Sequence, residues 1–139
     1  MVKDIVINKT QIIERCMKRV YEEYDNNEEN LKNFTKQDSI ILNIQRMCEA
    51  CIDLGMHYVA EHKLGIPQSS REVFDILKQE GVISPKLADS LKKMVGFRNI
   101  AVHDYQNINI DIVKNIIVND LNDIKDFSSI ILLQVRDNF

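Results

Sequence analysis

The sequence is poor in the residues that divide a chain into short elements. It contains no tryptophan, four glycines and two prolines among 139 residues. So few turn-forming residues predict long helices joined by few connections. No apolar run approaches the ~20 residues that a membrane-spanning helix needs. The N-terminus also lacks the continuous apolar segment of a signal peptide, so we expect a globular protein of the cytosol with no membrane partner.

The chain has no large excess of charge of either sign. Its formal net charge is -3, with 45% hydrophobic and 28% charged residues. This balance is typical of a globular fold, and it argues against a surface that binds nucleic acid over the whole molecule. A local basic patch stays compatible with it. The length corresponds to about one domain, and we predict a single helical domain over residues 1–139.

Cysteine is scarce, and its three copies do not form a metal-binding pattern. Cys48 and Cys51 make one C-x-x-C pair, and Cys16 stands alone. A structural zinc site needs about four ligands, and the sequence has no second pair. Cys48 and Cys51 also fall on the apolar stripe of a predicted helix, where small buried thiols are common. Packing is therefore the favoured interpretation, with a redox or metal role as the alternative.

Apolar residues recur at helical spacing along most of the chain. The pattern predicts an all-α, up-and-down bundle of about five helices. The expected helices cover about 9–24, 36–63, 69–81, 85–103 and 111–135, and the polar segment 25–33 is predicted to connect the first two.

Capping residues mark three of the predicted starts. Thr35 resembles the cap of the second helix, Ser69 with Glu72 forms a capping box, and Ser84 precedes a proline at the first helical position. The start of the last helix is ambiguous because three isoleucines at 108, 110 and 112 alternate as in a strand. Helix from Asp111 is preferred, because the longer period continues beyond it.

The stretch "VGFRNIAVHDYQN" interrupts the apolar stripe of the predicted helix 85–103. Arg98 takes a position where the next apolar residue belongs. A buried guanidinium without a partner is costly, so Arg98 is expected to face a cleft, a carboxylate or an anionic ligand. His103 follows five residues later, about 140° around a regular helix. The two side chains therefore meet only if the helix ends or distorts, or if a second subunit contributes.

Arginine and histidine together suit the cleavage of an RNA phosphodiester without a metal. Arginine holds a phosphate by two parallel hydrogen bonds, and histidine transfers protons near neutral pH. The 2'-hydroxyl of the RNA would then act as nucleophile, while Arg98 stabilises the developing charge. Lys86, Lys92 and Lys93 make the same helix locally basic. A capping histidine and an arginine paired with another helix are the structural alternatives.

These residues resemble a known signature. The segment "GFRNIAVHDY" is similar to the arginine-x4-histidine motif of the HEPN superfamily, in the form found in HepT-type toxins. Those toxins have a tyrosine two residues after the histidine, which corresponds here to Tyr105. The resemblance extends over about residues 8–135. It identifies Arg98 and His103 as catalytic residues, with Asn99 and Asp104 as supporting residues.

The resemblance implies a function and a set of partners. It implies an all-α homodimer whose two subunits line one cleft, and a metal-independent endoribonuclease that uses no cofactor. It also implies a toxin with an RNA substrate and a small nucleotidyltransferase antitoxin, which would transfer AMP to Tyr105. Added bulk and negative charge beside the cleft would repel RNA. The alternative is a non-catalytic HEPN module that binds a nucleotide or supports the nucleotidyltransferase.

Overall fold

The computed structural model describes residues 2–137, and this part of the chain is helical without a strand. The predicted all-α bundle is therefore confirmed. The elements are α1 Val2–Tyr24, η1 Glu28–Lys32, α2 Phe34–Glu61, α3 Ser70–Gln79, α4 Pro85–His103, η2 Tyr105–Asn107, α5 Ile110–Asn115, η3 Ile116–Asp120 and α6 Leu121–Asp137. The labels η1 and η2 denote 3-10 turns, and η3 is a π-helical turn.

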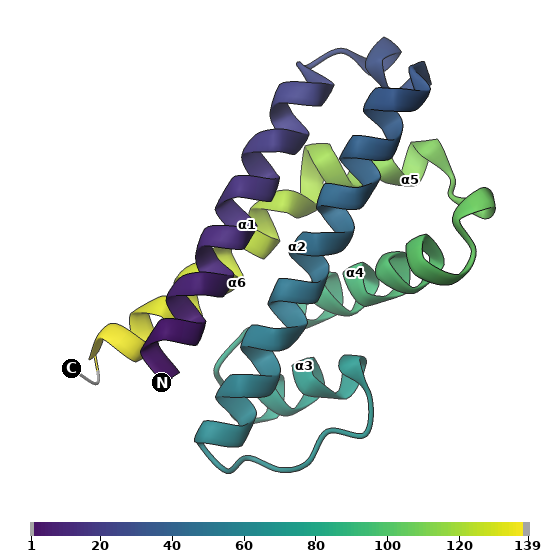
Figure 1. Cartoon of the computed structure of the whole chain (residues 1–139). Coiled ribbons are helices and arrows are strands. Elements are labelled where there is room, and N and C mark those ends of the chain that lie inside the picture. The colour runs from purple at the N-terminus through teal and green to yellow at the C-terminus, as the bar shows by residue number, and fades with distance from the viewer. Residues whose placement is uncertain (1, 138–139) are drawn as a thin grey trace.

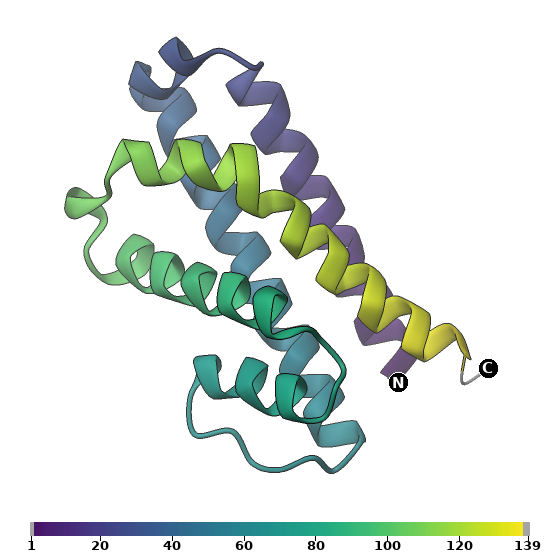
Figure 2. The same ribbon diagram turned by 180° about the vertical axis from the view of Figure 1, so that it is seen from behind.

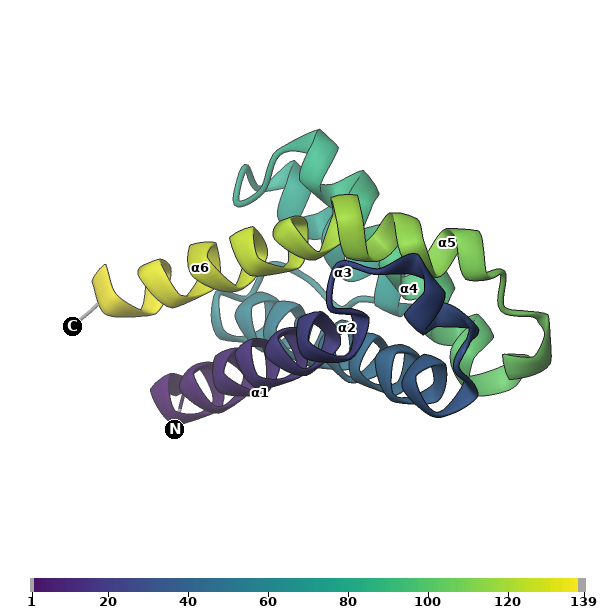
Figure 3. The ribbon, with the colours of Figure 1, turned by 90° about the horizontal axis from the view of Figure 1, so that it is seen from above.

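The helices pack in two layers. Figure 1 shows α1 and α2 side by side, with α6 behind α1. Viewed from above, α1 and α2 form one layer, and α4, α5 and α6 lie beyond it (Figure 3). The start of α1 and the end of α6 lie close together at one end of the bundle (Figures 1 and 2). The core between the layers contains fully buried aliphatic and aromatic side chains, including Ile44, Met47, Leu91, Leu121 and Phe127.

Two of the three predicted caps are confirmed. The Ser69 hydroxyl accepts a hydrogen bond from the Glu72 N–H at 3.2 Å. The Ser84 hydroxyl accepts one from the Leu87 N–H at 3.1 Å. The predicted Thr35 cap is wrong: the Asn33 side chain accepts from the Lys36 N–H at 3.1 Å, and α2 begins earlier, at Phe34. Asparagine satisfies a free helix N–H at least as well as threonine.

The predicted single helix 111–135 is not continuous. It begins at Ile110, capped by Asn109, and widens into the π turn Ile116–Asp120 before α6. A π turn adds one residue to the turn and shifts the side chains that follow it. Ile116, Leu121 and Ile124 can therefore all be buried. In a regular α-helix, Ile116 and Leu121 would point in different directions. Viewed from behind, the three segments form one bent rod beside α4 (Figure 2).

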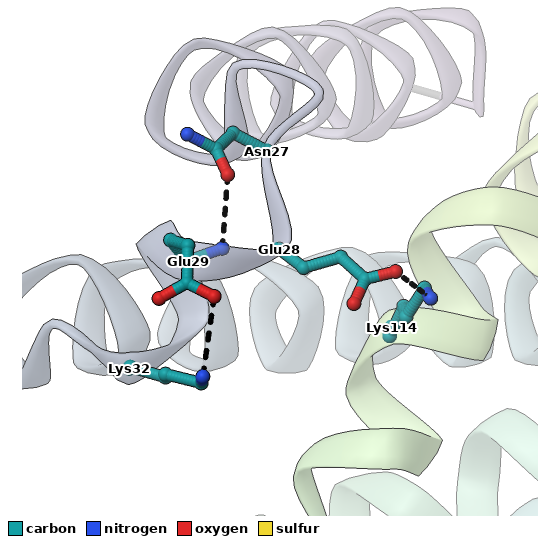
Figure 4. Close-up of polar contacts among 5 residues, drawn as sticks. All are labelled: Asn27, Glu28, Glu29, Lys32 and Lys114. Carbon is teal, nitrogen blue, oxygen red and sulfur yellow. Dashed lines mark hydrogen bonds and ion pairs between the residues drawn. The ribbon is translucent and has the colours of Figure 1, made fainter.

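The polar connection between α1 and α2 is more ordered than its composition suggests. It contains the turn η1, which buries Leu31 to 2% exposure. The Asn27 side chain accepts a hydrogen bond from the Glu29 N–H at 3.0 Å. Glu28 forms an ion pair with Lys114 of α5, as Figure 4 shows. This end of the first layer is thereby joined to α5.

The short helix α3 lies very close to α2 because of one glycine. A Cβ atom on Gly55 would lie 2.5 Å from the Cγ1 of Val73. Only glycine permits this approach without a shift of the neighbouring side chain. The close packing fixes α3 beside α4, and the first residue of α3, Ser70, contacts Arg98.

Candidate functional site

Arg98 lies partly buried on α4, with an uncompensated charge. Its Nη2 donates a hydrogen bond to the Ser70 hydroxyl at 3.2 Å, and its Nε is buried without a hydrogen-bond partner. Within the described part of the chain, no carboxylate lies within 4.0 Å of the guanidinium. Burial raises the pKa of the Cys48 thiol to about 12, and the nearby Arg98 charge acts in the opposite direction. Of the three surroundings expected for Arg98, namely a cleft, a carboxylate or an anionic ligand, the carboxylate is absent among the described residues.

His103 ends α4 and is exposed to solvent. The next residue, Asp104, caps the helix through its N–H, which donates to the Ile100 carbonyl at 2.8 Å. The Asp104 carboxylate accepts a hydrogen bond from the Asn107 amide at 2.8 Å. Because α4 stays α-helical to His103, Arg98 and His103 project about 140° apart within one chain. A distortion of the helix end does not bring them together.

Tyr105 is 41% exposed at the start of η2. Its hydroxyl donates a hydrogen bond to the Asp38 carboxylate in the second turn of α2. Burial, followed by the hydrogen bond and charge of Asp38, raises the pKa of Tyr105 to about 12. The phenol is therefore neutral at physiological pH, accessible, and held by a proton acceptor.

Ser70 and Asp38 are the two site residues that sequence reasoning missed. They lie 28 and 67 positions from their partners Arg98 and Tyr105. Neither belongs to the motif, and no spacing rule connects residues so far apart. Only the packing of α2 and α3 against α4 reveals them. Asn99 lies exposed on α4, next to Arg98.

The basic character predicted for this helix is only partly available to a ligand. Lys92 forms an ion pair with Asp75 of α3 at 2.9 Å, whereas Lys86 and Lys93 are exposed. A cavity of about 380 Å³ lies between α4, α5 and η3, and Lys93 is among its lining residues. Asp120 lines this cavity with 8% exposure, and burial raises the pKa of its carboxyl.

Comparisons with known proteins show the family of this chain. The family profile described as Ribonuclease HepT-like matches residues 10–131. This chain belongs to the HepT-like family. It is 51% identical over 128 residues to the mRNA nuclease HepT of Shewanella oneidensis, covering 92% of this chain and 96% of that protein.

HepT-like proteins of known structure share this fold. One structure is described as a toxin–antitoxin with AMP-PNP; its matching chain has a TM-score of 0.88 and 50% identity, with 92% of this chain and 97% of that chain covered. Another contains tri-AMPylated Shewanella oneidensis HEPN toxin in complex with MNT antitoxin, with a TM-score of 0.87 and 51% identity, covering 92% of this chain and 96% of that one.

A more distant structure shows the fold alone. It is the cytosolic protein YutE of Bacillus subtilis, with a TM-score of 0.82 and 19% identity, covering 96% of this chain and 90% of that chain. Among the described residues of our chain, no helix is both long enough and apolar enough to cross a membrane.

Proposed function

We propose that this protein is an endoribonuclease toxin that cleaves RNA in the cytosol and is neutralised by a nucleotidyltransferase antitoxin. The observation that carries the proposal is the environment of Arg98. Its guanidinium is partly buried and lacks a carboxylate in the described structure, one and a half turns before an exposed histidine. A site that keeps a cation without a counterion is suited to an anionic ligand.

Arg98 and His103 divide the reaction between them. His103 accepts the proton of the RNA 2'-hydroxyl as its oxygen attacks phosphorus, and the bond from phosphorus to the 5'-oxygen breaks. The leaving 5'-oxygen takes up a proton from water, so the products are a 2',3'-cyclic phosphate and a 5'-hydroxyl. Arg98 binds the phosphate and stabilises its charge in the transition state. The reaction requires no metal, and Asn99 and Asp104 support the arrangement from the same helix end.

A homodimer resolves the separation between the two side chains. α4 is regular from Pro85 to His103, so Arg98 and His103 of one chain face different directions. A second α4, placed against the first, brings Arg98 of one chain to the His103 of the other. The ribonuclease site is therefore composite in the proposed assembly.

The antitoxin acts on Tyr105 in this proposal. The phenolic oxygen attacks the α-phosphorus of ATP, pyrophosphate leaves, and the phenolic proton is lost. The exposure of Tyr105 and its contact with Asp38 support this role. The 51% sequence identity with a HEPN toxin that is tri-AMPylated in its complex with MNT antitoxin supports this role as well. An AMP group two residues from His103 would place negative charge where RNA phosphate must bind.

The test is RNA cleavage by purified variants. His103→Ala and Arg98→Ala should each lower the cleavage rate by about 10²–10⁴, and excess chelator should leave the wild-type rate unchanged. His62→Ala is the matched control, because this exposed histidine lies at the C-terminal end of α2 and outside the motif. Cleavage that survives both motif substitutions would contradict the proposed site. No cleavage by the wild type would instead indicate a non-catalytic module.

A further inference from the structure

A second cationic feature lies away from the motif, in a groove between α1 and α2. The groove has a volume of about 360 Å³. Arg15 and Arg19 line it from α1, and Arg46 lines it from α2. Figure 1 shows these two helices side by side in the layer opposite α4 and α6. Three of the six arginines of an acidic chain are therefore gathered at one place.

The groove keeps an excess of positive charge. Within the described part of the chain, none of the three forms an ion pair within 4.0 Å. The groove also contains two carboxylates, against four cationic side chains, Lys9 and the three arginines. Asp53 forms an ion pair with Lys9 at 2.9 Å, and Glu49 accepts a hydrogen bond from the Gln45 amide at 3.1 Å.

The arrangement of the three guanidinium groups suits a ligand with more than one phosphate. Arg15 and Arg19 are one helical turn apart, so their backbones lie about 6 Å apart along the same face of α1. Like charges at this spacing repel one another, and Arg46 adds a third on the facing wall. Between them, Cys16 is buried to 4% exposure. Burial raises the pKa of its thiol, while the charges of all three arginines lower it.

The lining of the groove favours a phosphate chain over a protein partner. Protein interfaces contain a buried apolar centre. No large apolar side chain with high exposure lines this groove, and Ile12 is only partly exposed. Arginine binds phosphate oxygens in bidentate geometry, and a groove with cations on both walls follows the backbone of a single strand.

We propose that the α1–α2 groove binds the phosphate backbone of single-stranded RNA, remote from the bond that is cleaved. The inference rests on the proposed function, since it assigns a second contact to the same RNA substrate. Arg46 and Cys48 are two positions apart on α2 and therefore face opposite sides. The Arg98 charge acts on the buried Cys48 thiol, so the groove and Arg98 lie on opposite sides of α2, a helix about 10 Å across. One strand passing over α2 reaches both.

The test compares two variants with the same change in net charge. One carries Arg15→Gln, Arg19→Gln and Arg46→Gln, and the control carries Lys63→Gln, Lys78→Gln and Lys125→Gln, three lysines without an ion pair in the described structure. Both are made in a His103→Ala background, so that RNA stays intact. The probe is a labelled single-stranded RNA of about 20 nucleotides, and fluorescence anisotropy is measured across a salt series.

The groove variant should bind the RNA about tenfold more weakly than the control. Its plot of log affinity against log salt should be flatter by about two units, as expected for three lost contacts to a single strand. Equal losses in both variants would reduce the effect to overall charge and overturn the proposal. Unchanged binding by the groove variant would overturn it as well.

Two further measurements test whether a mononucleotide or the antitoxin, rather than RNA, occupies the groove. If ATP displaces the RNA at equal phosphate concentration, the groove is a mononucleotide site and the proposal is wrong. It is also wrong if the groove variant keeps RNA binding but no longer binds the antitoxin.

The single variant Arg46→Gln excludes misfolding as the cause. It should have an unchanged melting temperature and must show part of the same loss of RNA affinity. If the wild type binds RNA through the groove but does not cleave it, only the catalytic proposal is wrong. If the wild type cleaves RNA but the groove variant binds RNA as well as the control does, only the groove proposal is wrong.

Discussion

The hydroxyl of Tyr105 donates a hydrogen bond to the carboxylate of Asp38, which joins the segment after α4 to the start of α2. Burial raises the pKa of the phenol, and this contact raises it further. A neutral phenol is a weak nucleophile, and a hydrogen-bonded carboxylate is placed to accept its proton. The pair therefore matches the need of an AMP transfer to Tyr105, in which the oxygen attacks phosphorus and the proton must leave.

We predict that Asp38→Asn slows the modification of Tyr105 by the nucleotidyltransferase. The amide keeps the shape of the side chain but accepts a proton poorly, so the rate should fall by about 10², the lower range for a proton-transfer group. Tyr105→Phe should prevent the modification entirely. Intact-mass measurement after incubation with the antitoxin and ATP follows both effects.

Tyr105→Phe also separates modification from catalysis. The phenyl ring remains, so RNA cleavage should persist while neutralisation is lost. Asp111→Asn is the control for Asp38→Asn, because this exposed carboxylate on α5 forms no hydrogen bond with the phenol in the described structure. An AMP unit found on the Tyr105→Phe protein would place the acceptor elsewhere. An Asp38→Asn rate equal to that of the control would show that the carboxylate only packs against the ring.

A composite site should be recoverable by mixing inactive subunits. Arg98→Ala and His103→Ala homodimers each lack one of the two groups at both sites. A heterodimer restores one site with both groups if each site takes Arg98 from one chain and His103 from the other. Random exchange of subunits makes about half of the dimers mixed, so roughly a quarter of the wild-type sites should return.

The readout is RNA cleavage after the two variants have been unfolded and refolded together. The control is the same mixture without unfolding, in which slow exchange keeps activity low. If each site were built from a single chain, co-refolding would restore nothing, because every chain carries one substitution and no site would have both groups. Recovery of cleavage thus demonstrates a shared site, and its absence despite verified heterodimers contradicts it.

The fold was largely predictable because its signals are local. Ser84 followed by Pro85, and Ser69 followed by Glu72, fix the starts of two helices with neighbouring atoms only. The errors arose where neighbours compete or where packing decides. Asn33 caps α2 in place of Thr35, and α1 begins at Val2 rather than near Lys9. The π turn at Ile116–Asp120 depends on how the buried side chains fit the core.

The candidate site was predictable only along α4. Arg98 was evident because a cation interrupts an apolar stripe, and its lack of a carboxylate partner agrees with that interpretation. The partners Ser70 and Asp38 come from other helices and leave no local pattern. The groove arginines were not evident either, because Arg15 and Arg46 come together only when α1 and α2 pair.

Two glycine substitutions should have opposite effects on stability. Gly55→Ala places a methyl group 2.5 Å from Val73 in the packed contact between α2 and α3, so the free energy of unfolding should fall by about 1–3 kcal/mol. Gly96→Ala meets only the mobile end of Arg71, at 2.9 Å. It should be neutral or stabilising by up to about 1 kcal/mol, because alanine favours a helix over glycine.

Denaturant unfolding followed by circular dichroism measures both glycine variants. Adding Val73→Ala to Gly55→Ala removes the Cγ atom that the new methyl group meets. The double variant should therefore lose less stability than the sum of the two single losses. Strict additivity would show that the clash is relieved by a backbone shift instead.

The last prediction concerns the buried carboxyl of Asp120, which lines the cavity between α4 and η3. Burial raises its pKa above the ordinary value, Asp123 adds to the shift, and Lys93 opposes it. An acid whose pKa is raised by folding binds its proton more tightly in the folded state. Its ionisation therefore costs stability as the pH rises through the folded pKa, and this cost is absent below the unfolded value.

Asp120→Asn keeps the shape without the charge, so at pH 7 it should raise the free energy of unfolding by about 1 kcal/mol, the lower end of the cost of an unpaired buried polar group. The gain should shrink as the pH is lowered toward the ordinary range of aspartate. Asp126→Asn, an exposed carboxylate on the same rod, is the control and should show no such pH dependence. Urea unfolding of the three proteins from acidic to neutral pH measures the effect, and a loss of stability in Asp120→Asn at neutral pH would mean that the ionised carboxylate is a stabilising partner in the folded protein.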